Sequence, residues 1–261
     1  MSDNLLIPKS VDVIVENVLG PTSKEIGEDI KTLYQKGRDL ILLKAFKKLK
    51  DPQDNKTANL RVARDVFWNG SFTDEAICAE YFGGILASSR SADGKDDSGI
   101  YYTDIIKSLS SHQLLLHYVI YRALNLLWNE KNFDKEKPNV GLMSDLAKYY
   151  IWFTTIELEK TYFIDIEKDL IALYNKGLVG DSYEAKGYKL ENGAELPYTK
   201  VQPSTLGIQL YATANNRLSE WRNFTSVDFE DFSEIKNPKY FAFSIEDLLI
   251  KIGIKKDGSK I

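Results

Sequence analysis

Three acidic residues in one part of the chain have the chemistry of a cation site. Asp93 and Asp97 lie in the polar segment 91–99, and Asp104 follows shortly after it. Carboxylate oxygens spaced along a loop could bind calcium or hold a metal ion for hydrolysis. The alternating ligands and the final glutamate of an EF-hand are absent, however, and aspartate and glycine are ordinary turn formers. The segment is therefore predicted to be a turn, and a hydrolase with an acidic metal site stays an alternative.

The histidines and the cysteine do not form a second set of catalytic residues. His112 and His117 are five residues apart, so they do not share a helix face as the ligands of a His-x-x-x-His motif do. Cys78 lies on an apolar segment, where burial is expected rather than nucleophilic attack. The chain also lacks a Gly-x-Ser-x-Gly elbow and a Walker-type phosphate loop. We therefore assign no catalytic residue, expect no cofactor and no metal, and favour a non-enzymatic function.

Lysines gather at the end of the first long helical pattern. The pattern spans about 22–50, and its last turns contain Lys44, Lys47, Lys48 and Lys50. Such a cluster could bind nucleic acid or a membrane surface, but cations are also favoured at the C-terminal end of a helix dipole. No arginine-rich continuation follows, so we expect solvated side chains at a helix end.

Composition and charge exclude several classes of protein. The 261 residues carry a formal net charge of −4, whereas general nucleic-acid binders usually have a basic surplus. The single cysteine excludes an internal disulfide and is consistent with a reducing compartment. No apolar stretch is long enough to span a membrane, and the N-terminus lacks the features of a secretory signal. These observations predict a cytoplasmic protein without a membrane span.

Three glycines are candidates for a role in packing. Gly83 and Gly84 lie inside the helix predicted over 73–90, where each glycine costs about 1 kcal/mol relative to alanine. Such a pair is typical of close packing against a bulky neighbour. Gly177 follows the helix predicted over 164–176, and its freedom to adopt a left-handed conformation predicts the end of that helix.

Serines mark three of the predicted helix starts. Ser110 is followed three residues later by Gln113, which is the pattern of a capping box. Ser204 and Ser244 each precede a short apolar segment. We expect a helix to begin at each of the three serines.

The order of elements predicts a mostly α fold. Helical spacing continues through most of 22–176. The dipeptide Asn192-Gly193 then predicts one small β-hairpin over about 183–201, followed by a short helix. Helices followed by a hairpin are the element order of a winged helix-turn-helix unit. We therefore predict a helical domain over 1–100, a winged-helix-like domain over 101–214 and an aromatic-rich C-terminal extension over 215–261.

The charges of the winged-helix-like domain argue against DNA recognition. Residues 164–176, which would form the recognition helix, have a net charge of −1, and the hairpin over 183–201 has none. A helix in the major groove needs arginine, lysine, asparagine or glutamine toward the bases and basic flanks toward the phosphates. We expect weak DNA binding or none, and a protein partner or self-association instead.

Four short motifs follow one another in a characteristic order. They are Gly-Pro-Thr-Ser-Lys-Glu-Ile-Gly-Glu at 20–28, Ala-Glu-Tyr-Phe-Gly-Gly-Ile-Leu-Ala-Ser-Ser at 79–89, Asp-Ile-Ile-Lys-Ser-Leu-Ser at 104–110 and Val-Gln-Pro-Ser-Thr-Leu-Gly at 201–207. Together they resemble the abortive-infection alpha family of bacterial proteins, also known as a domain of unknown function. The central helix of that family typically has Trp-Ala-x-Leu-Leu-Ala, where this chain has Tyr-Phe-Gly-Gly-Ile-Leu-Ala at 81–87. The resemblance covers about 20–210 and implies a role in phage defence, with no catalytic residues to carry over.

The sequence thus favours a bacterial cytoplasmic protein of phage defence that acts through protein contacts. Two alternatives stay open. One is a winged-helix transcriptional regulator or another DNA-binding protein. The other is a hydrolase that uses acids such as Asp93, Asp97 and Asp104.

Overall fold

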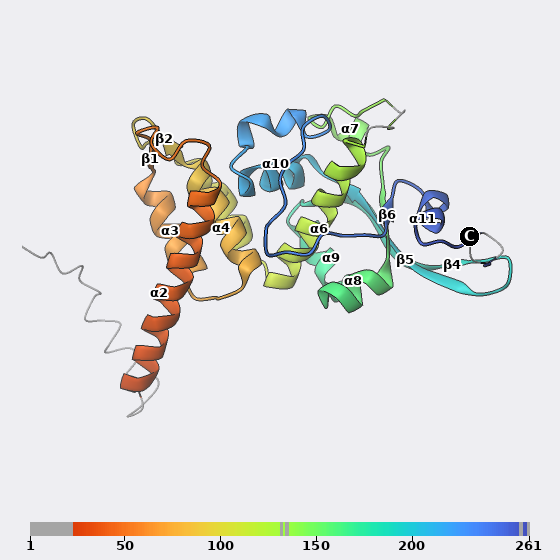
Figure 1. Cartoon of the computed structure of the whole chain (residues 1–261), viewed down its shortest axis with the longest axis horizontal. Coiled ribbons are helices and arrows are strands. Elements are labelled where there is room, and N and C mark those ends of the chain that lie inside the picture. The colour runs from red at the N-terminus through yellow and green to blue at the C-terminus, as the bar shows by residue number, and fades with distance from the viewer. Residues whose placement is uncertain (1–22, 131–132, 134–135, 256–257, 260–261) are drawn as a thin grey trace, which may run out of the picture.

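This computed structural model describes residues 23–130, 133, 136–255, 258 and 259. In Figure 1 a group of helices lies at one end of the molecule, and an antiparallel sheet with further helices lies at the other. One continuous hydrophobic core nevertheless runs from Ile41 to Phe241. The core contains residues of all three predicted domains, whose boundaries stay a prediction.

The N-terminal group consists of four helices and a short two-stranded ladder: α2 (Ser23–Lys47), α3 (Leu60–Gly70), α4 (Ala76–Ser88), α5 (Gly99–Ile106), β1 (Thr57–Ala58) and β2 (Arg90–Ser91). α3 begins where the Asn59 side chain accepts hydrogen bonds from the backbone amides of Arg61 and Val62. Apart from Glu80, α4 is apolar around its circumference, and residues 77–87 are all buried. It therefore forms the centre of this group, with α2, α3 and α5 packed against it.

α6 (Ser111–Trp128) connects the two ends of the molecule and packs against α4. Its predicted capping box is confirmed. The Ser110 hydroxyl accepts a hydrogen bond of 3.2 Å from the Gln113 amide, and the Gln113 side chain accepts one of 2.9 Å from the Ser110 amide. Two backbone donors that a helix start leaves without partners are thereby satisfied.

Four strands form an antiparallel sheet in the order β4–β5–β3–β6: β3 (Ile151–Thr154), β4 (Val179–Lys189), β5 (Glu195–Pro203) and β6 (Phe241–Ala242). The predicted hairpin is present, since β4 and β5 pair from Lys189 opposite Glu195 to Tyr183 opposite Val201. Gly193 has a φ of 84° in the turn, a left-handed conformation that Asn-Gly turns favour.

The prediction of a mostly α fold with one small hairpin was wrong. The described residues form two antiparallel sheets, of two and four strands, so the fold is mixed helix and sheet. β3 lies within the stretch that was assigned to helices, because periodicity alone does not separate a short buried strand from a helix. β6 comes from the C-terminal extension and pairs with β3. Both strands depend on partners far away in the chain, and local spacing did not reveal them.

The remaining elements are α7 (Met143–Leu146), α8 (Thr155–Tyr162), α9 (Ile166–Asn175), α10 (Thr205–Ala214), η2 (Leu218–Asn223) and α11 (Ile245–Lys251). The chain runs through α6, β3, α8, α9, β4 and β5, and β5 lies between β4 and β3. In the predicted winged-helix-like domain, α9 was expected as the recognition helix and β4–β5 as the wing.

The ends of these later helices follow the local signals. Gly177 has a φ of 68° after α9, and the Leu178 amide donates to the Leu173 carbonyl at 2.9 Å, which closes the helix. Ser204 caps α10 and Ser244 caps α11, each by accepting a hydrogen bond from a backbone amide three residues later.

The C-terminal extension is fastened to α6 by buried polar residues. The Asn125 side chain donates to the carbonyls of Phe224 (2.7 Å) and Val227 (2.9 Å) and accepts from the Phe229 amide (2.9 Å). Arg122, which is also buried on α6, forms ion pairs of 2.5 Å with two aspartates of the same extension. The Asn125 bonds satisfy backbone groups that burial has removed from water, and the ion pairs satisfy the buried Arg122 charge.

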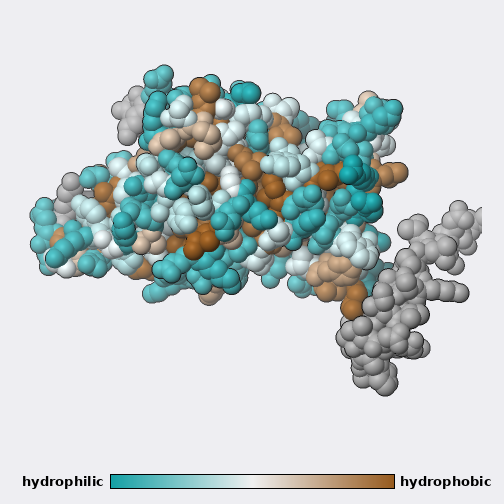
Figure 2. Space-filling model, turned by 180° about the vertical axis from the view of Figure 1, so that it is seen from behind, coloured by the Kyte–Doolittle hydropathy of each residue, from teal (hydrophilic) through white to brown (hydrophobic). Residues whose placement is uncertain are grey.

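Figure 2 shows the molecule from behind. On that face hydrophobic residues occur in small separate groups among hydrophilic ones. No helix within the described ranges combines the length and the apolar character needed to cross a membrane.

Candidate functional site

The acidic segment forms turns. The Asp93 carboxylate accepts hydrogen bonds from the Ser91 hydroxyl (3.0 Å) and the Lys95 amide (3.1 Å). The Asp96 carboxylate accepts from the amide (3.0 Å) and the hydroxyl (2.7 Å) of Ser98. Aspartates that bind their own backbone two residues on are typical of turns, as the sequence predicted.

The other two acids of the hydrolase alternative have separate partners. Asp97 pairs with Arg61 at 3.1 Å, and Asp104 pairs with Lys107 at 2.6 Å. Within the ranges the structure describes, no group of three histidine, cysteine, aspartate or glutamate residues is arranged to hold a metal ion. The structure therefore does not bring Asp93, Asp97 and Asp104 together into one site.

The histidines and the cysteine occupy different environments. His112 is exposed in the first turn of α6, whereas His117 is fully buried and its Nδ1 shares a hydrogen bond with the Tyr81 hydroxyl. Burial lowers the pKa of His117 to about 3, so its ring is neutral at physiological pH. Burial also raises the pKa of the Cys78 thiol to about 11, which leaves little thiolate for nucleophilic attack.

Gly83 and Gly84 lie where α4 crosses two other helices. A Cβ atom on Gly83 would lie 2.9 Å from the backbone of Ala45 in α2. A Cβ atom on Gly84 would lie 2.0 Å from the carbonyl oxygen of Ala214 in α10. Backbone atoms cannot rotate away as side chains can, so the two glycines let α2 and α10 approach α4 closely.

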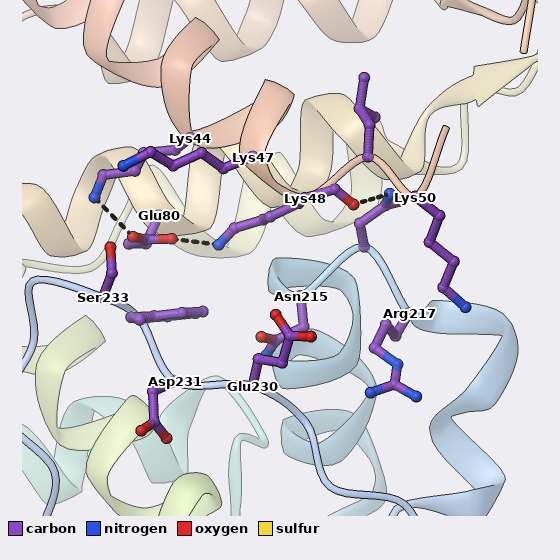
Figure 3. Close-up of a pocket in the computed structure, with 13 residues that line it drawn as sticks. Lys44, Lys47, Lys48, Lys50, Glu80, Asn215, Arg217, Glu230, Asp231 and Ser233 are labelled. Atoms are coloured by element: carbon purple, nitrogen blue, oxygen red, sulfur yellow. Dashed lines mark hydrogen bonds and ion pairs between the residues drawn. The ribbon is translucent and has the colours of Figure 1, made fainter. Parts of the chain in front are cut away.

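The lysine cluster was expected to be solvated, but two of its lysines form ion pairs where α2 meets α4 and the C-terminal extension (Figure 3). We call this contact the α2–α4 joint. The Lys44 ammonium lies 2.9 Å from Glu80 of α4 and 2.7 Å from Glu234 of the C-terminal extension. Lys48 forms a second ion pair with Glu80 and lies 4.2 Å from the centre of the Phe232 ring. The expectation of solvated side chains was wrong for Lys44, of which 1% is exposed.

This environment shifts the pKa values of the two lysines in opposite directions. Burial lowers the pKa of Lys48, and the Glu80 carboxylate only partly offsets it. Burial also lowers the pKa of Lys44, but its hydrogen bonds to Glu234 and Glu80 outweigh that effect and the net pKa is raised. The same contact lowers the pKa of Glu234.

A cavity of about 400 Å³ opens beside this joint. Its walls combine cationic, anionic and amide groups, among them Lys48, Glu80, Asn215 and Glu230. In Figure 3 the Lys48 ammonium points to Glu80, and a dashed line marks their ion pair. The buried lysine is therefore already paired, and the cluster joins α2, α4 and the C-terminal extension.

One sequence signal could have revealed the joint. Glu80 is the only charged residue of α4, which is otherwise apolar. A buried carboxylate needs a cationic partner. The lysines at the end of α2 were the available partners, and Gly83 marks the place where the two helices meet.

The outward face of α9 bears on the DNA alternative. Its exposed residues are Glu167, Lys168, Ile171, Tyr174 and Asn175. Of the two other acids, Asp169 is buried, and Asp165, which caps the N-terminus of the helix, is exposed. The net charge predicted from the sequence therefore does not describe this face. The face is distinguished by two large exposed hydrophobic side chains: Ile171 is 49% exposed and Tyr174 is 40% exposed.

Two of the three lysines of the β4–β5 hairpin are paired with a glutamate, and the third, Lys189, is exposed. Glu184 accepts hydrogen bonds from Lys186 (2.6 Å) and the Tyr198 hydroxyl (2.9 Å), and it lies 3.6 Å from the Lys200 ammonium. Lys200 also lies 4.2 Å from the centre of the Tyr150 ring. A wing of this kind offers few cations that are free to contact phosphates.

Comparisons with protein-family models, with curated proteins and with solved structures found no match.

Proposed function

We propose that this chain is a bacterial phage-defence protein that acts by binding another protein, and that the outward face of α9 makes the contact. The observation that carries the proposal is the pair Ile171 and Tyr174 on that face. Exposed aromatic and aliphatic side chains on a rigid helix are typical anchors of protein interfaces. The defence role rests on the resemblance of the four sequence motifs to the abortive-infection alpha family.

The expected partner is a protein surface with apolar side chains. The α8–α9 turn adds a further anchor, because Phe163 is 75% exposed and has a φ of 55°. This left-handed conformation ends α8, since the Phe163 amide donates to the Leu158 carbonyl, and the aromatic ring is left exposed. A DNA backbone would gain little from these groups, because it needs cations and hydrogen-bond donors.

A DNA-binding regulator is the second candidate, and the element order of α9 followed by the β4–β5 hairpin favours it. Lys168 of α9 and Lys176, which caps its C-terminus, are both exposed and would have to contact phosphates or bases. The hydrolase alternative is not favoured, since its three acids are separated and individually paired.

Phage plating on a bacterial host that expresses the chain tests the proposal. Phage should form fewer plaques with the wild type than without it, and Ile171→Glu/Tyr174→Glu should abolish protection at unchanged protein level and melting temperature. Lys168→Ala/Lys176→Ala is the matched control and should keep protection. The opposite result for the two double variants, together with duplex DNA binding at physiological salt, would favour the regulator.

A further inference from the structure

We propose that the cavity beside the α2–α4 joint binds a small carbonyl acid, that is, an aldehyde or ketone that carries a carboxylate, and that Lys48 holds it covalently as an imine. This site is separate from the protein contact proposed on α9. Three features support it: the size of the cavity, the position of Lys48 in its wall, and the charges around that wall.

The cavity has the size of a small-molecule site. Its volume of about 400 Å³ lies within the range of about 300–1,000 Å³ that is usual for ligand pockets. The end of α2, one residue of α4, the turn after α10 and the C-terminal extension all contribute to the wall. Leu49 and Phe232 are its only apolar residues, so the cavity suits a charged ligand better than an apolar one.

Lys48 is the lysine of the joint that is open to this cavity. The Lys44 side chain is 1% exposed and pairs with two carboxylates, whereas Lys48 is 11% exposed and, within the described ranges, pairs with Glu80 alone. Burial, and to a smaller extent the Lys44 ammonium, disfavour the charged form of Lys48 and lower its pKa. A lysine that is buried beside another cation has more of the neutral amine, which is the form that attacks a carbonyl carbon.

Glu80 is placed to carry the protons of imine formation. Its carboxylate takes one proton from the Lys48 ammonium, and the neutral nitrogen bonds to the carbonyl carbon while the electron pair of the C=O π bond moves to oxygen. A second proton moves from nitrogen to that oxygen. The C–O bond then breaks as Glu80 gives its proton to the departing hydroxyl, and the nitrogen lone pair forms the C=N bond. The products are water and a protonated imine, which keeps a positive charge beside Glu80 and near the Phe232 ring.

The charges outside the joint favour a carboxylate on the ligand. The joint itself is neutral, since two lysines face two glutamates in it. The other cations of the wall are Lys47, Lys50 and Arg217 (Figure 3). Glu220 pairs with the last two of these, at 2.9 Å and 2.6 Å, and Glu230 is a second acid on this side. The third acid, Asp231, is paired with Arg122 at 2.5 Å. One positive charge is therefore left over.

A hydrogen-bond donor for that carboxylate is also present in the wall. The Nε of Arg217 is buried and has no hydrogen-bond partner among the described residues. A buried donor without a partner costs about 1–3 kcal/mol, and an anionic ligand group would satisfy it.

Reductive trapping on the wild-type chain tests the proposal. Glyoxylate is the simplest aldehyde acid, and cyanoborohydride transfers a hydride to the imine carbon, which leaves a carboxymethyl group on the lysine nitrogen. Mass spectrometry of the digested chain measures the rate at each lysine. At neutral pH, Lys48 should be modified at least about tenfold faster than Lys36, an exposed lysine of α2 outside the cavity, because the neutral fraction of a lysine rises tenfold with each unit by which its pKa falls.

Acetaldehyde, which lacks the carboxylate, tests the class of ligand. With the rate at Lys36 as the reference, Lys48 should prefer glyoxylate over acetaldehyde by about tenfold, the effect of one hydrogen bond to a charged group. Lys48→Arg keeps a cation beside Glu80, so the fast modification should disappear while that of Lys36 continues at its wild-type rate.

The wild-type chain carries the decisive measurement, so the test does not depend on the folding of a variant. Equal rates at Lys48 and Lys36 would overturn the imine site, because Lys48 would then be only a structural partner of Glu80. Modification of Lys48 that begins only when the near-ultraviolet circular dichroism of the fold is lost would overturn it too, since the reagent then reaches an unfolded chain. An equal preference for the two aldehydes at both lysines would overturn the assignment of a carbonyl acid.

Discussion

The Lys44 ammonium lies 2.9 Å from the Glu80 carboxylate, and the two side chains are only 1% and 5% exposed. Glu80 also pairs with Lys48, and Lys44 also pairs with Glu234. The pair therefore joins α2 to α4 and to the C-terminal extension. Charges in such a place are stable only while each keeps its partner.

Removal of the Glu80 charge should destabilise the fold strongly. Glu80→Gln leaves two cations near each other in a largely buried site, and we expect a loss of about 3–5 kcal/mol in the free energy of unfolding. Urea denaturation measures this loss. Asp74→Asn is the matched control, because it removes the exposed Lys36–Asp74 pair and should cost about 0–1 kcal/mol. Equal effects of the two substitutions would refute the structural role of the buried pair.

Gly84→Ala should lower stability although alanine is the better helix former. The new methyl group would overlap the Ala214 carbonyl, and we expect a cost of about 1–3 kcal/mol after any gain in helix propensity. Gly84→Leu should cost more. Thermal unfolding measures both, with Asp97→Ala and His112→Ala as surface controls that leave the melting temperature unchanged. A silent Gly84→Ala variant would show that α4 and α10 can move apart freely.

Asn125→Ala should detach the C-terminal extension from α6. The substitution leaves the Phe229 amide without its partner, and a buried unsatisfied group costs about 1–3 kcal/mol. The carbonyls of Phe224 and Val227 keep only the longer hydrogen bonds of 3.3 Å and 3.4 Å from the Asn129 side chain. Hydrogen exchange should become faster first at Phe229. Asn69→Ala, which removes an exposed bond within α3, is the control and should leave exchange in the extension unchanged. Unchanged exchange in the Asn125 variant would contradict this anchoring.

Acid should destabilise the protein through His117. Its native pKa is about 3, whereas an unfolded histidine titrates near pH 6.5. Between these values the unfolded state binds a proton that the native state does not, so stability is complete above about pH 6.5 and falls toward pH 3. The contribution to the slope is about 1.4 kcal/mol per pH unit at most.

Comparison of the wild type with His117→Gln isolates this contribution from that of the carboxylates. The variant should be less stable at neutral pH and should lose stability less steeply between pH 6 and pH 4. Parallel curves of unfolding free energy against pH would show that His117 is accessible to protons in the native state.

The sequence determined the features that depend on neighbours along the chain. The Ser110 capping box, the end of α9 at Gly177 and the Asn192-Gly193 turn each depend on a few adjacent residues, so their types and order were sufficient. The helical spacing of α2, α4 and α6 was readable for the same reason. The acidic turn at Asp93 also followed from local chemistry.

The tertiary structure decided which distant residues those elements contact. Glu80 finds Lys44 36 positions away and Lys44 finds Glu234 190 positions away, so no local pattern distinguishes a buried lysine from a solvated one. β3 becomes a strand because β5 and β6 supply hydrogen-bond partners from distant parts of the chain. A strand and a buried charge are both stabilised by partners, and burial itself comes from the packing of the whole chain. Spacing along a sequence reports which face of an element is apolar, whereas its three-dimensional neighbours decide which polar groups lose water and what replaces it.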